Sequence, residues 1–167
     1  MIDNEYLLPP DIVALARRVV AENLAAGRMV SLAESCTGGL VAAALTEIAG
    51  SSAVLDRGFV TYSNEAKHEA LGISTDILET FGSVSIACAW AMAQGALKRS
   101  RSDVAVAISG IAGPEGGTSS KPVGTVVFAR AIRGQDEVEA EQRQLDGSSR
   151  SMVRHQAALI ALELLLP

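Results

Sequence analysis

The chain has 167 residues, of which 49% are apolar, 20% are charged and 4% are aromatic, and its formal net charge is −5. This composition excludes an intrinsically disordered chain, because disorder combines low hydrophobicity with high net charge. It also argues against a membrane protein, since no apolar run approaches the ~20 residues of a spanning helix, and against a nucleic-acid partner, since there is no basic footprint.

The cysteines and the first residues indicate where the protein works. Two cysteines, Cys36 and Cys88, cannot make a disulfide framework, which fits a reducing compartment, and we expect the protein in the cytoplasm. The first six residues are acidic where a secretory signal peptide needs basic ones, so no signal peptide is predicted. A chain of this length can bury roughly 70% of its unfolded surface, which is enough for one core.

The first third of the sequence predicts a helix, a strand and a second helix. Apolar residues recur at helical spacing from Pro10-Asp11 onward, and Gly27 ends this helix. Residues 29–33 form a short apolar run that is typical of a buried strand. The polar segment 34–39 follows it, and an alanine-rich helix is predicted over residues 40–48.

The middle third predicts one strand and a series of helices. Residues 54–62 are rich in β-branched and aromatic side chains, which favours a strand. Asn64 is predicted to cap a short helix over residues 65–71. Residues 75–81 predict one or two further helical turns, and Ser85 is predicted to cap a longer helix that ends at about residue 99.

The last third predicts three strands and a final helix. The predicted strands are residues 103–108, 123–132 and 137–145, and a hairpin turn at Gly134-Gln135 joins the last two. The third of them is weaker and is predicted to lie at the edge of the sheet. Ser148 or Ser149 caps the last helix, which runs to Leu166. This alternation indicates one α/β domain over residues 1–167 with a mostly parallel sheet.

Three polar segments follow directly after strands of this predicted sheet. They span residues 34–39, 62–67 and 109–121. In open α/β sheets, ligands bind outside the carboxyl ends of the strands. If the three strands are neighbours, the three segments converge on one cleft, where we expect the functional site.

Ser35 is the first candidate for chemistry because it lies at a strand-to-helix junction. Thr37, Gly38 and Gly39 follow it, with helix-start N–H groups that can stabilise a phosphate or a developing oxyanion. The serine is either a nucleophile beside its own oxyanion donors or a helix cap, and capping is the commoner role. Cys36 is an alternative nucleophile, because helix N-termini lower the pKa of a thiol; its ordinary role is that of a buried packing residue.

Lys67 is a candidate general base. It falls in the first turn of the helix over residues 65–71, where a cation is disfavoured, and partial burial there lowers the pKa of the amine. Tyr62 lies at the end of the preceding strand. Together with Ser35, these side chains can activate a hydroxyl without histidine. Taken singly, the lysine and the tyrosine are more often surface residues.

The glycine-rich segment 109–122 is the longest irregular stretch, and such loops in compact domains are usually functional. It has neither Walker A nor G-x-G-x-x-G spacing, but its N–H groups and Lys121 can hold a phosphate or a ribose. The alternative is a mobile crossing loop. No metal site is predicted, because His68 and His155 are isolated from other ligand-type residues.

Three long motifs in a fixed order carry a resemblance to a known family. They are AESCTGG at 33–39, RGFVTYSNEAK at 57–67 and SGIAGPEGG at 109–117, and KPVGT at 121–125 and residues 147–154 add to them. Over about residues 12–165 the chain closely resembles the CinA carboxy-terminal domain family, in the stand-alone form of the nicotinamide-nucleotide amidases. The resemblance implies a three-layer α/β/α sandwich with a mixed sheet of five strands, assembled as a homo-oligomer.

The resemblance also implies a reaction. Family members deamidate nicotinamide mononucleotide to nicotinic acid mononucleotide and ammonia, so the expected partner is that molecule or a related pyridine nucleotide. Ser35 then attacks the carboxamide carbon, while Tyr62 and Lys67 handle its proton and later protonate the leaving ammonia. No metal or organic cofactor is implied. The expected substrate-binding residues are Thr37, Gly38, Gly39, Asn64, Ser109, Gly110, Gly113, Gly117, Thr118, Lys121 and Arg150.

Two departures and one alternative accompany this interpretation. Relatives often carry an acidic residue after the Val-Ser that matches Val84-Ser85, where this chain has Ile86-Ala87. They often have Asp at the position of Ser148. Arg150 and Arg154 lie four residues apart and are either ligand or interface residues or simply solvated. The alternative function is a non-catalytic nucleotide-binding or regulatory module with the same cleft.

Overall fold

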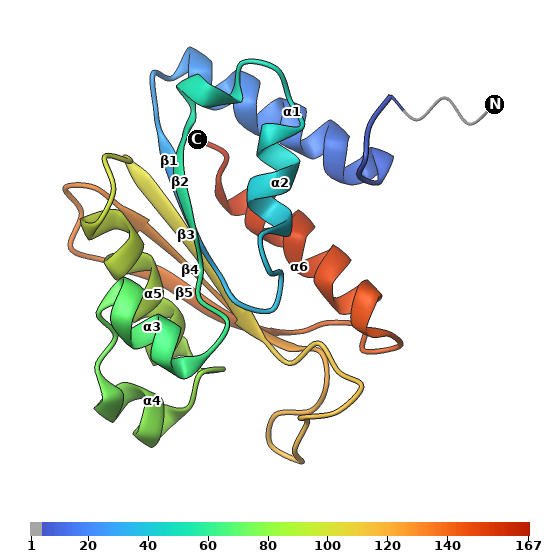
Figure 1. Ribbon diagram of the computed structural model, residues 1–167, viewed down its shortest axis with the longest axis vertical. Helices are drawn as coiled ribbons and strands as arrows, with labels where there is room; N and C mark the ends of the chain where they lie inside the picture. Colours follow the sequence, from blue (N-terminus) through green and yellow to red (C-terminus); the bar gives the residue numbers. More distant parts are fainter. Residues whose placement is uncertain (1–4) are drawn as a thin grey trace.

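The structure, a computed structural model, describes residues 5–167 and shows one β-sheet between two layers of helices (Figure 1). Residues 1–4, which include part of the acidic start on which the signal-peptide prediction depends, lie outside the described residues. The predicted three-layer α/β/α arrangement is confirmed.

The sheet has five strands in the order β2-β1-β3-β4-β5. β1 pairs in parallel with both β2 and β3, whereas β4 runs antiparallel to β3 and to β5. Four strands therefore point the same way, which confirms the predicted mixed, mostly parallel sheet with its last strand at the edge. The strands are β1 (Val30–Glu34), β2 (Leu55–Val60), β3 (Val104–Gly110), β4 (Thr125–Ile132) and β5 (Val138–Gln144).

Each face of the sheet is covered by its own group of helices (Figure 1). Apolar side chains of α1, α2 and α6 form one core with the sheet, and those of α3, α4 and α5 form the other. The helices are α1 (Pro10–Ala25), α2 (Leu40–Thr46), α3 (Asn64–Leu71), α4 (Thr75–Phe81), α5 (Ile86–Lys98) and α6 (Arg150–Leu164), and a short 3-10 turn, η1 (Ser51–Ala53), precedes β2.

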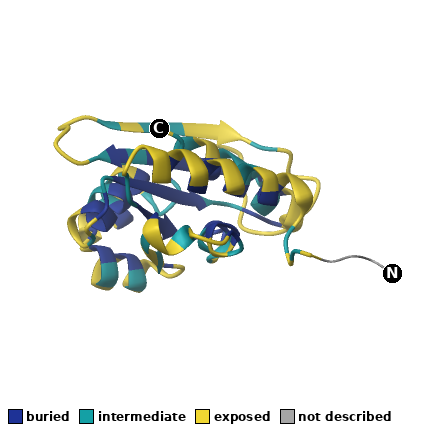
Figure 2. Ribbon diagram, turned by 90° about the horizontal axis from the view of Figure 1, so that it is seen from above, coloured by how far each residue is buried: buried dark blue, intermediate teal, exposed yellow. Residues whose placement is uncertain are grey.

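Small residues bring these layers close together. All of β1 and nearly all of β3 are buried, whereas β5 at the edge is largely exposed (Figure 2). Gly95 of α5 lies where the end of α3 approaches, because a Cβ atom at this position would collide with the backbone carbonyl oxygen of Leu71. The alanine and glycine content of the sequence thus permits close contacts between layers without large aromatic side chains.

Serine side chains cap several of the helices. Ser85 caps α5 as predicted, and Ser149 is the residue of the predicted pair that caps α6. For α3 the prediction of Asn64 as the cap is wrong by one residue. Ser63 caps this helix, since its backbone is extended and its Oγ accepts the N–H of Ala66 at 3.0 Å, whereas Asn64 is already helical.

The topology places the predicted polar segments together. β1, β2 and β3 are adjacent and parallel, so their carboxyl ends meet at one edge, beside the glycine-rich loop and the start of α6 (Figure 1). Within residues 5–167, no helix has the length and apolar character to cross a membrane. The same residues contain no group of three or more His, Cys, Asp or Glu side chains that could hold a metal ion.

Candidate active site

Ser35 follows β1 directly and is held at the edge of the sheet. Its N–H donates to the carbonyl of Ile108 in β3 at 2.9 Å, which continues the strand pairing by one residue. Gly38 (φ 60°) and Gly39 (φ 98°) then turn the chain into α2 with left-handed backbone that favours glycine. The serine thus lies on a sharp strand-to-helix turn, and only 7% of its surface is exposed.

Lys67 points into the sheet edge and meets this serine. The Nζ atom lies 3.0 Å from Ser35 Oγ, and it donates to the backbone carbonyls of Thr61 at 2.8 Å and of Tyr62 at 3.2 Å. Lys67 is 1% exposed and is among the largest fully buried side chains of the described residues. The two carbonyls fix the amine against the serine hydroxyl.

The environment of Lys67 favours its neutral form. Burial lowers the pKa of the Lys67 amine below its usual value of 10.5, in the predicted direction. A neutral amine has two N–H donors and one lone pair. The donors match the two carbonyls, so the lone pair is left to accept the proton of the Ser35 hydroxyl. This is the contact that a serine nucleophile with a lysine base would require.

Tyr62 and Arg150 form a second side-chain pair at the site. Arg150 donates one N–H to the Tyr62 hydroxyl at 3.0 Å and another to the carbonyl of Gly113 at 2.7 Å. The first turn of α6 is thereby connected to the end of β2 and to the glycine-rich loop. The side chain of Tyr62 contacts Arg150, and it is the backbone carbonyl of Tyr62 that contacts Lys67.

A pocket of about 250 Å³ opens between these segments. Its walls come from the turn after Ser35, the end of β2, the segment before α5, the glycine-rich loop and the start of α6. The lining residues are Cys36, Tyr62, Ser83, Val84, Gly110, Ile111, Ala112, Gly113, Glu115, Gly116 and Arg150.

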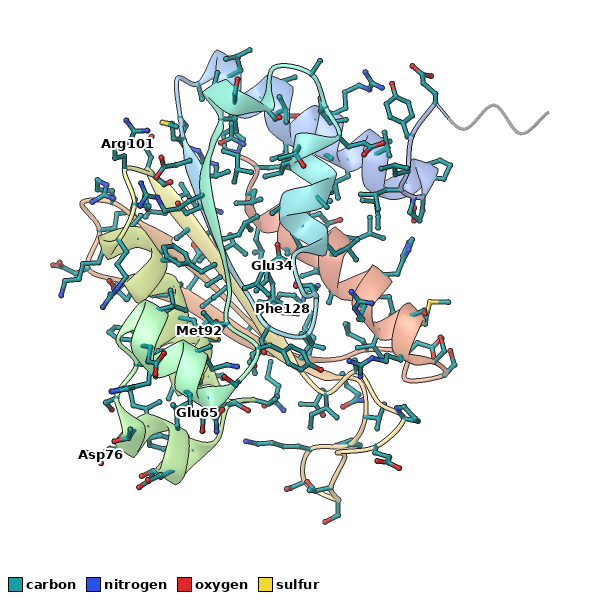
Figure 3. All side chains as sticks on the ribbon, in the orientation of Figure 1. Glu34, Glu65, Asp76, Met92, Arg101 and Phe128 are labelled. Atoms are coloured by element: carbon teal, nitrogen blue, oxygen red, sulfur yellow. The ribbon has the colours of Figure 1, made fainter. Side chains whose placement is uncertain are left out.

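The backbone N–H groups around Ser35 are mostly engaged. The buried carboxylate of Glu34 accepts the N–H groups of Gly39, Val41 and Ala42 at 2.9–3.2 Å, and so caps α2 (Figure 3 labels Glu34 beside this helix). The N–H of Gly38 donates to the carbonyl of Ser35. Among the hydrogen bonds of residues 5–167, none uses the N–H of Cys36 or Thr37. At this turn, the backbone N–H groups of Cys36 and Thr37 are therefore the ones free to donate to an oxyanion. The N–H groups of Gly38 and Gly39, which were predicted as donors, already donate to other groups of the turn.

The Cys36 thiol is a poor alternative nucleophile. Burial raises the pKa of this thiol to about 11, so that it is protonated at neutral pH. The thiolate, which is the reactive form, is thus disfavoured at the position next to Ser35.

A family model and curated relatives show to which family the chain belongs. The model of the CinA C-terminal domain matches residues 12–167. The chain belongs to the CinA C-terminal domain family. Two relatives are both named nicotinamide-nucleotide amidohydrolase PncC. The protein from Enterobacter agglomerans is 54% identical, over 83% of this chain and 84% of its own length. The protein from Escherichia coli K12 is 49% identical, over 93% of each chain.

Other CinA family members differ in length. A CinA-like protein from Syntrophotalea carbinolica is 46% identical over 94% of this chain, which spans only 39% of that protein. The crystal structure of competence/damage inducible protein CihA from Agrobacterium tumefaciens matches with a TM-score of 0.92 and 52% identity over 96% of both chains. A CinA superfamily protein from Klebsiella pneumoniae matches with a TM-score of 0.86 and 41% identity.

Not every predicted site residue of this CinA family member lines the pocket. Ser35 and Lys67 are themselves not lining residues, and they lie behind Cys36 and Tyr62, their neighbours in sequence and contact, which are. Asn64 lines a separate pocket with α4. Lys121 donates to the carbonyl of Phe81 at the end of α4, and Thr118 bonds to Lys121 within the loop. Ser109 is buried and donates to the carbonyl of Ser83 at 2.8 Å, so it positions a wall residue.

Several residues that the sequence analysis did not single out contribute to the site. The pocket walls include Ser83, Val84 and Glu115, and the carbonyl of Thr61 holds Lys67. These residues contribute through their position in the fold or through their backbone atoms, and neither can be recognised from the type of residue in the sequence. The same is true of Glu34, which is the last residue of β1, so the hydrogen bonds of its carboxylate to the start of α2 also depend on how the chain folds.

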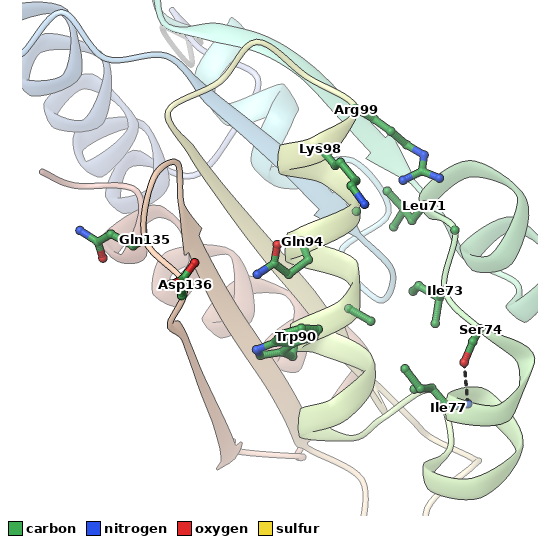
Figure 4. A pocket seen from close by; sticks show the side chains of 13 residues that line it. Leu71, Ile73, Ser74, Ile77, Trp90, Gln94, Lys98, Arg99, Gln135 and Asp136 are labelled. Atoms are coloured by element: carbon green, nitrogen blue, oxygen red, sulfur yellow. Dashed lines mark hydrogen bonds between the residues drawn. The ribbon is translucent and has the colours of Figure 1, made fainter.

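A larger pocket, of about 610 Å³, lies elsewhere. It runs along the outer face of α5, between the α3–α4 connection and the β4–β5 hairpin. Figure 4 shows Trp90, Gln94 and Lys98 along this face of α5, with Asp136 opposite. None of the predicted site residues lines it, whereas Tyr62, Gly113 and Arg150 line the smaller pocket, so volume alone does not identify the candidate active site.

Proposed function

We propose that this protein is an amidohydrolase that converts nicotinamide mononucleotide and water to nicotinic acid mononucleotide and ammonia, in pyridine nucleotide recycling. The observation that carries the proposal is the 3.0 Å contact of the buried Lys67 Nζ with Ser35 Oγ. The names of the relatives that share most of the chain support the substrate class.

In the first half of the reaction, Ser35 is the nucleophile and neutral Lys67 is the base. Lys67 accepts the hydroxyl proton as Oγ attacks the carboxamide carbon, which gives a tetrahedral intermediate with a negatively charged oxygen. The N–H groups of Cys36 and Thr37 stabilise that oxygen. The Lys67 ammonium then returns its proton to the leaving nitrogen, the C–N bond breaks, and ammonia departs from an ester of Ser35.

The second half repeats these steps with water. Lys67 takes a proton from water as the water oxygen attacks the ester carbon, the bond to Oγ breaks, and Oγ regains its proton. Tyr62, which the sequence analysis names as a second proton carrier, has its hydroxyl bonded to Arg150. We therefore assign the proton transfers to Lys67 and give the Tyr62 hydroxyl the role of orienting Arg150 at the pocket.

The charges around the pocket complement the proposed substrate. Nicotinamide mononucleotide combines an anionic phosphate with a cationic pyridinium ring, and the pocket carries Arg150 and Glu115. A pocket of about 250 Å³ is smaller than typical sites for whole ligands, so we place the ring and carboxamide inside it and the ribose phosphate toward Arg150. Apart from the water, every group that the steps above require belongs to the chain, and we propose no cofactor. We also propose a cytoplasmic homo-oligomer.

The deciding experiment is ammonia release from nicotinamide mononucleotide by the wild type and by Ser35→Ala, with a chelator present. We expect release by the wild type alone, with both proteins folded by circular dichroism. Full activity of Ser35→Ala would remove Ser35 as the nucleophile. No release from either folded protein, together with a rise in melting temperature on adding the nucleotide, would support the binding module instead.

A further inference from the structure

The side chain of Arg154 in α6 forms hydrogen bonds to the turn that follows Ser35. Its Nε donates to the carbonyl of Cys36 and its Nη2 donates to the carbonyl of Thr37, each at 3.1 Å. A Cβ atom on Gly38 would lie 3.7 Å from the same guanidinium group, so the arginine packs along the turn. Unlike Arg150, Arg154 is not a lining residue of the pocket.

These contacts determine where two N–H groups point. The carbonyl of Cys36 and the N–H of Thr37 belong to one trans peptide unit, so they point in opposite directions. With Arg154 on the carbonyl side, the N–H of Thr37 faces away from α6. The preceding peptide unit is fixed in the same manner, because the carbonyl of Ser35 accepts the N–H of Gly38 and thereby orients the N–H of Cys36.

The guanidinium group also polarises the peptide that it holds. A hydrogen bond from a cation to a carbonyl is stronger than a neutral one, and linked hydrogen bonds strengthen each other. The N–H of Thr37 becomes a better donor when the Cys36 carbonyl accepts from Arg154. It is also one of the two N–H groups of this turn that form no hydrogen bond among residues 5–167.

We propose that Arg154 is a positioning residue, which orients and polarises the Cys36–Thr37 peptide so that the N–H groups of Cys36 and Thr37 form the oxyanion hole for Ser35. This inference rests on the proposed function for its reaction. It separates the roles of the two arginines of α6, since Arg150 meets the substrate and Arg154 acts only through the backbone of the turn.

The test compares Arg154→Ala and Arg154→Lys with the matched control Arg18→Ala, an exposed arginine of α1. For Arg154→Ala we expect kcat to fall about 10- to 100-fold with KM within about threefold, because an oxyanion hole acts on the transition state. Arg154→Lys keeps a cation with a single nitrogen, so its kcat is intermediate. Added guanidinium ions restore part of the kcat of Arg154→Ala and have no effect on Ser35→Ala.

A second measurement does not depend on turnover. Pyridine-3-boronic acid forms a tetrahedral adduct on a serine oxygen, and one boronate oxygen then occupies the oxyanion position. We expect its affinity, measured by calorimetry, to fall at least tenfold in Arg154→Ala and to stay unchanged in Arg18→Ala. If boronate affinity falls in this way but the wild type does not hydrolyse nicotinamide mononucleotide, the proposed substrate is wrong and the role of Arg154 is still supported.

Three results would overturn the role of Arg154. They are a kcat and boronate affinity equal to the wild type, a rise in KM alone, and a fall in kcat that guanidinium does not rescue. If Arg154→Ala does not fold, as judged by its melting curve, the same criteria apply to Arg154→Lys.

Discussion

The amine of Lys67 and the hydroxyl of Ser35 are 3.0 Å apart, although the two residues are 32 positions apart in the chain. The carbonyls of Thr61 and Tyr62 accept hydrogen bonds from the same amine. The parallel pairing of β1 with β2 produces this contact, because it brings the residues after both strands to the same edge.

The pH dependence of activity should report the titration of Lys67. The reaction needs the neutral amine, and burial lowers the pKa of Lys67, so kcat/KM should rise with pH and level off below pH 10.5. Steady-state ammonia assays across the pH range in which the protein stays folded would measure this rise in kcat/KM. A rise in kcat/KM with its midpoint at or above pH 10.5 would contradict a buried lysine base.

The stability of the protein should show the same titration. Between the lowered pKa of folded Lys67 and 10.5, the unfolded state binds a proton that the folded state does not, so the free energy of unfolding rises with pH. Lys67→Met removes this dependence. We therefore expect any stability advantage of Lys67→Met over the wild type to shrink as the pH increases, as measured by urea denaturation. A difference that is independent of pH would exclude a shifted Lys67.

Tyr62→Phe separates the two contacts that Tyr62 makes. The variant keeps the backbone carbonyl on Lys67 and loses only the hydroxyl on Arg150. The loss of one hydrogen bond should lower kcat/KM roughly 2- to 10-fold in Tyr62→Phe, mainly through a higher KM. Lys67→Met should instead lower kcat about 100-fold or more. A loss of kcat in Tyr62→Phe as large as that in Lys67→Met would assign the tyrosine to proton transfer.

Cys36→Ala should remain active, within about threefold of the wild type. The thiol is buried and its pKa is raised to about 11, so the thiolate is scarce, and the proposed contribution of Cys36 is its backbone N–H. Ammonia release by Cys36→Ala and Ser35→Ala measured side by side checks this. An inactive Cys36→Ala beside an active Ser35→Ala would establish a thiol hydrolase.

Glu34→Gln should destabilise the fold. The carboxylate accepts three backbone N–H groups at the start of α2, and an amide has only one oxygen to replace both carboxylate oxygens. We expect a loss of about 1–3 kcal/mol in the free energy of unfolding. The exposed Glu22→Gln of α1 is the control, with a change within about 0.5 kcal/mol. Equal stabilities of the two variants would show that Glu34 is not the cap.

Much of the fold follows from local pattern. Short apolar runs, β-branched residues and helical spacing predict all five strands and the main helices, because the central strands and the inner faces of the helices must be apolar. The prediction of Asn64 as a cap is wrong because neighbouring Ser63 and Asn64 are both good caps, and only the chain direction after β2 determines which backbone is extended.

By itself the sequence determined the family, the layered α/β architecture and the pairing of a serine with a lysine at strand ends. Only the tertiary structure showed that Glu34 occupies the start of α2, that Arg154 holds the turn after Ser35, and that Lys121 bonds to α4. The physical reason is that side-chain type and spacing are written along the chain, whereas the partners of main-chain N–H and carbonyl groups depend on how distant segments pack.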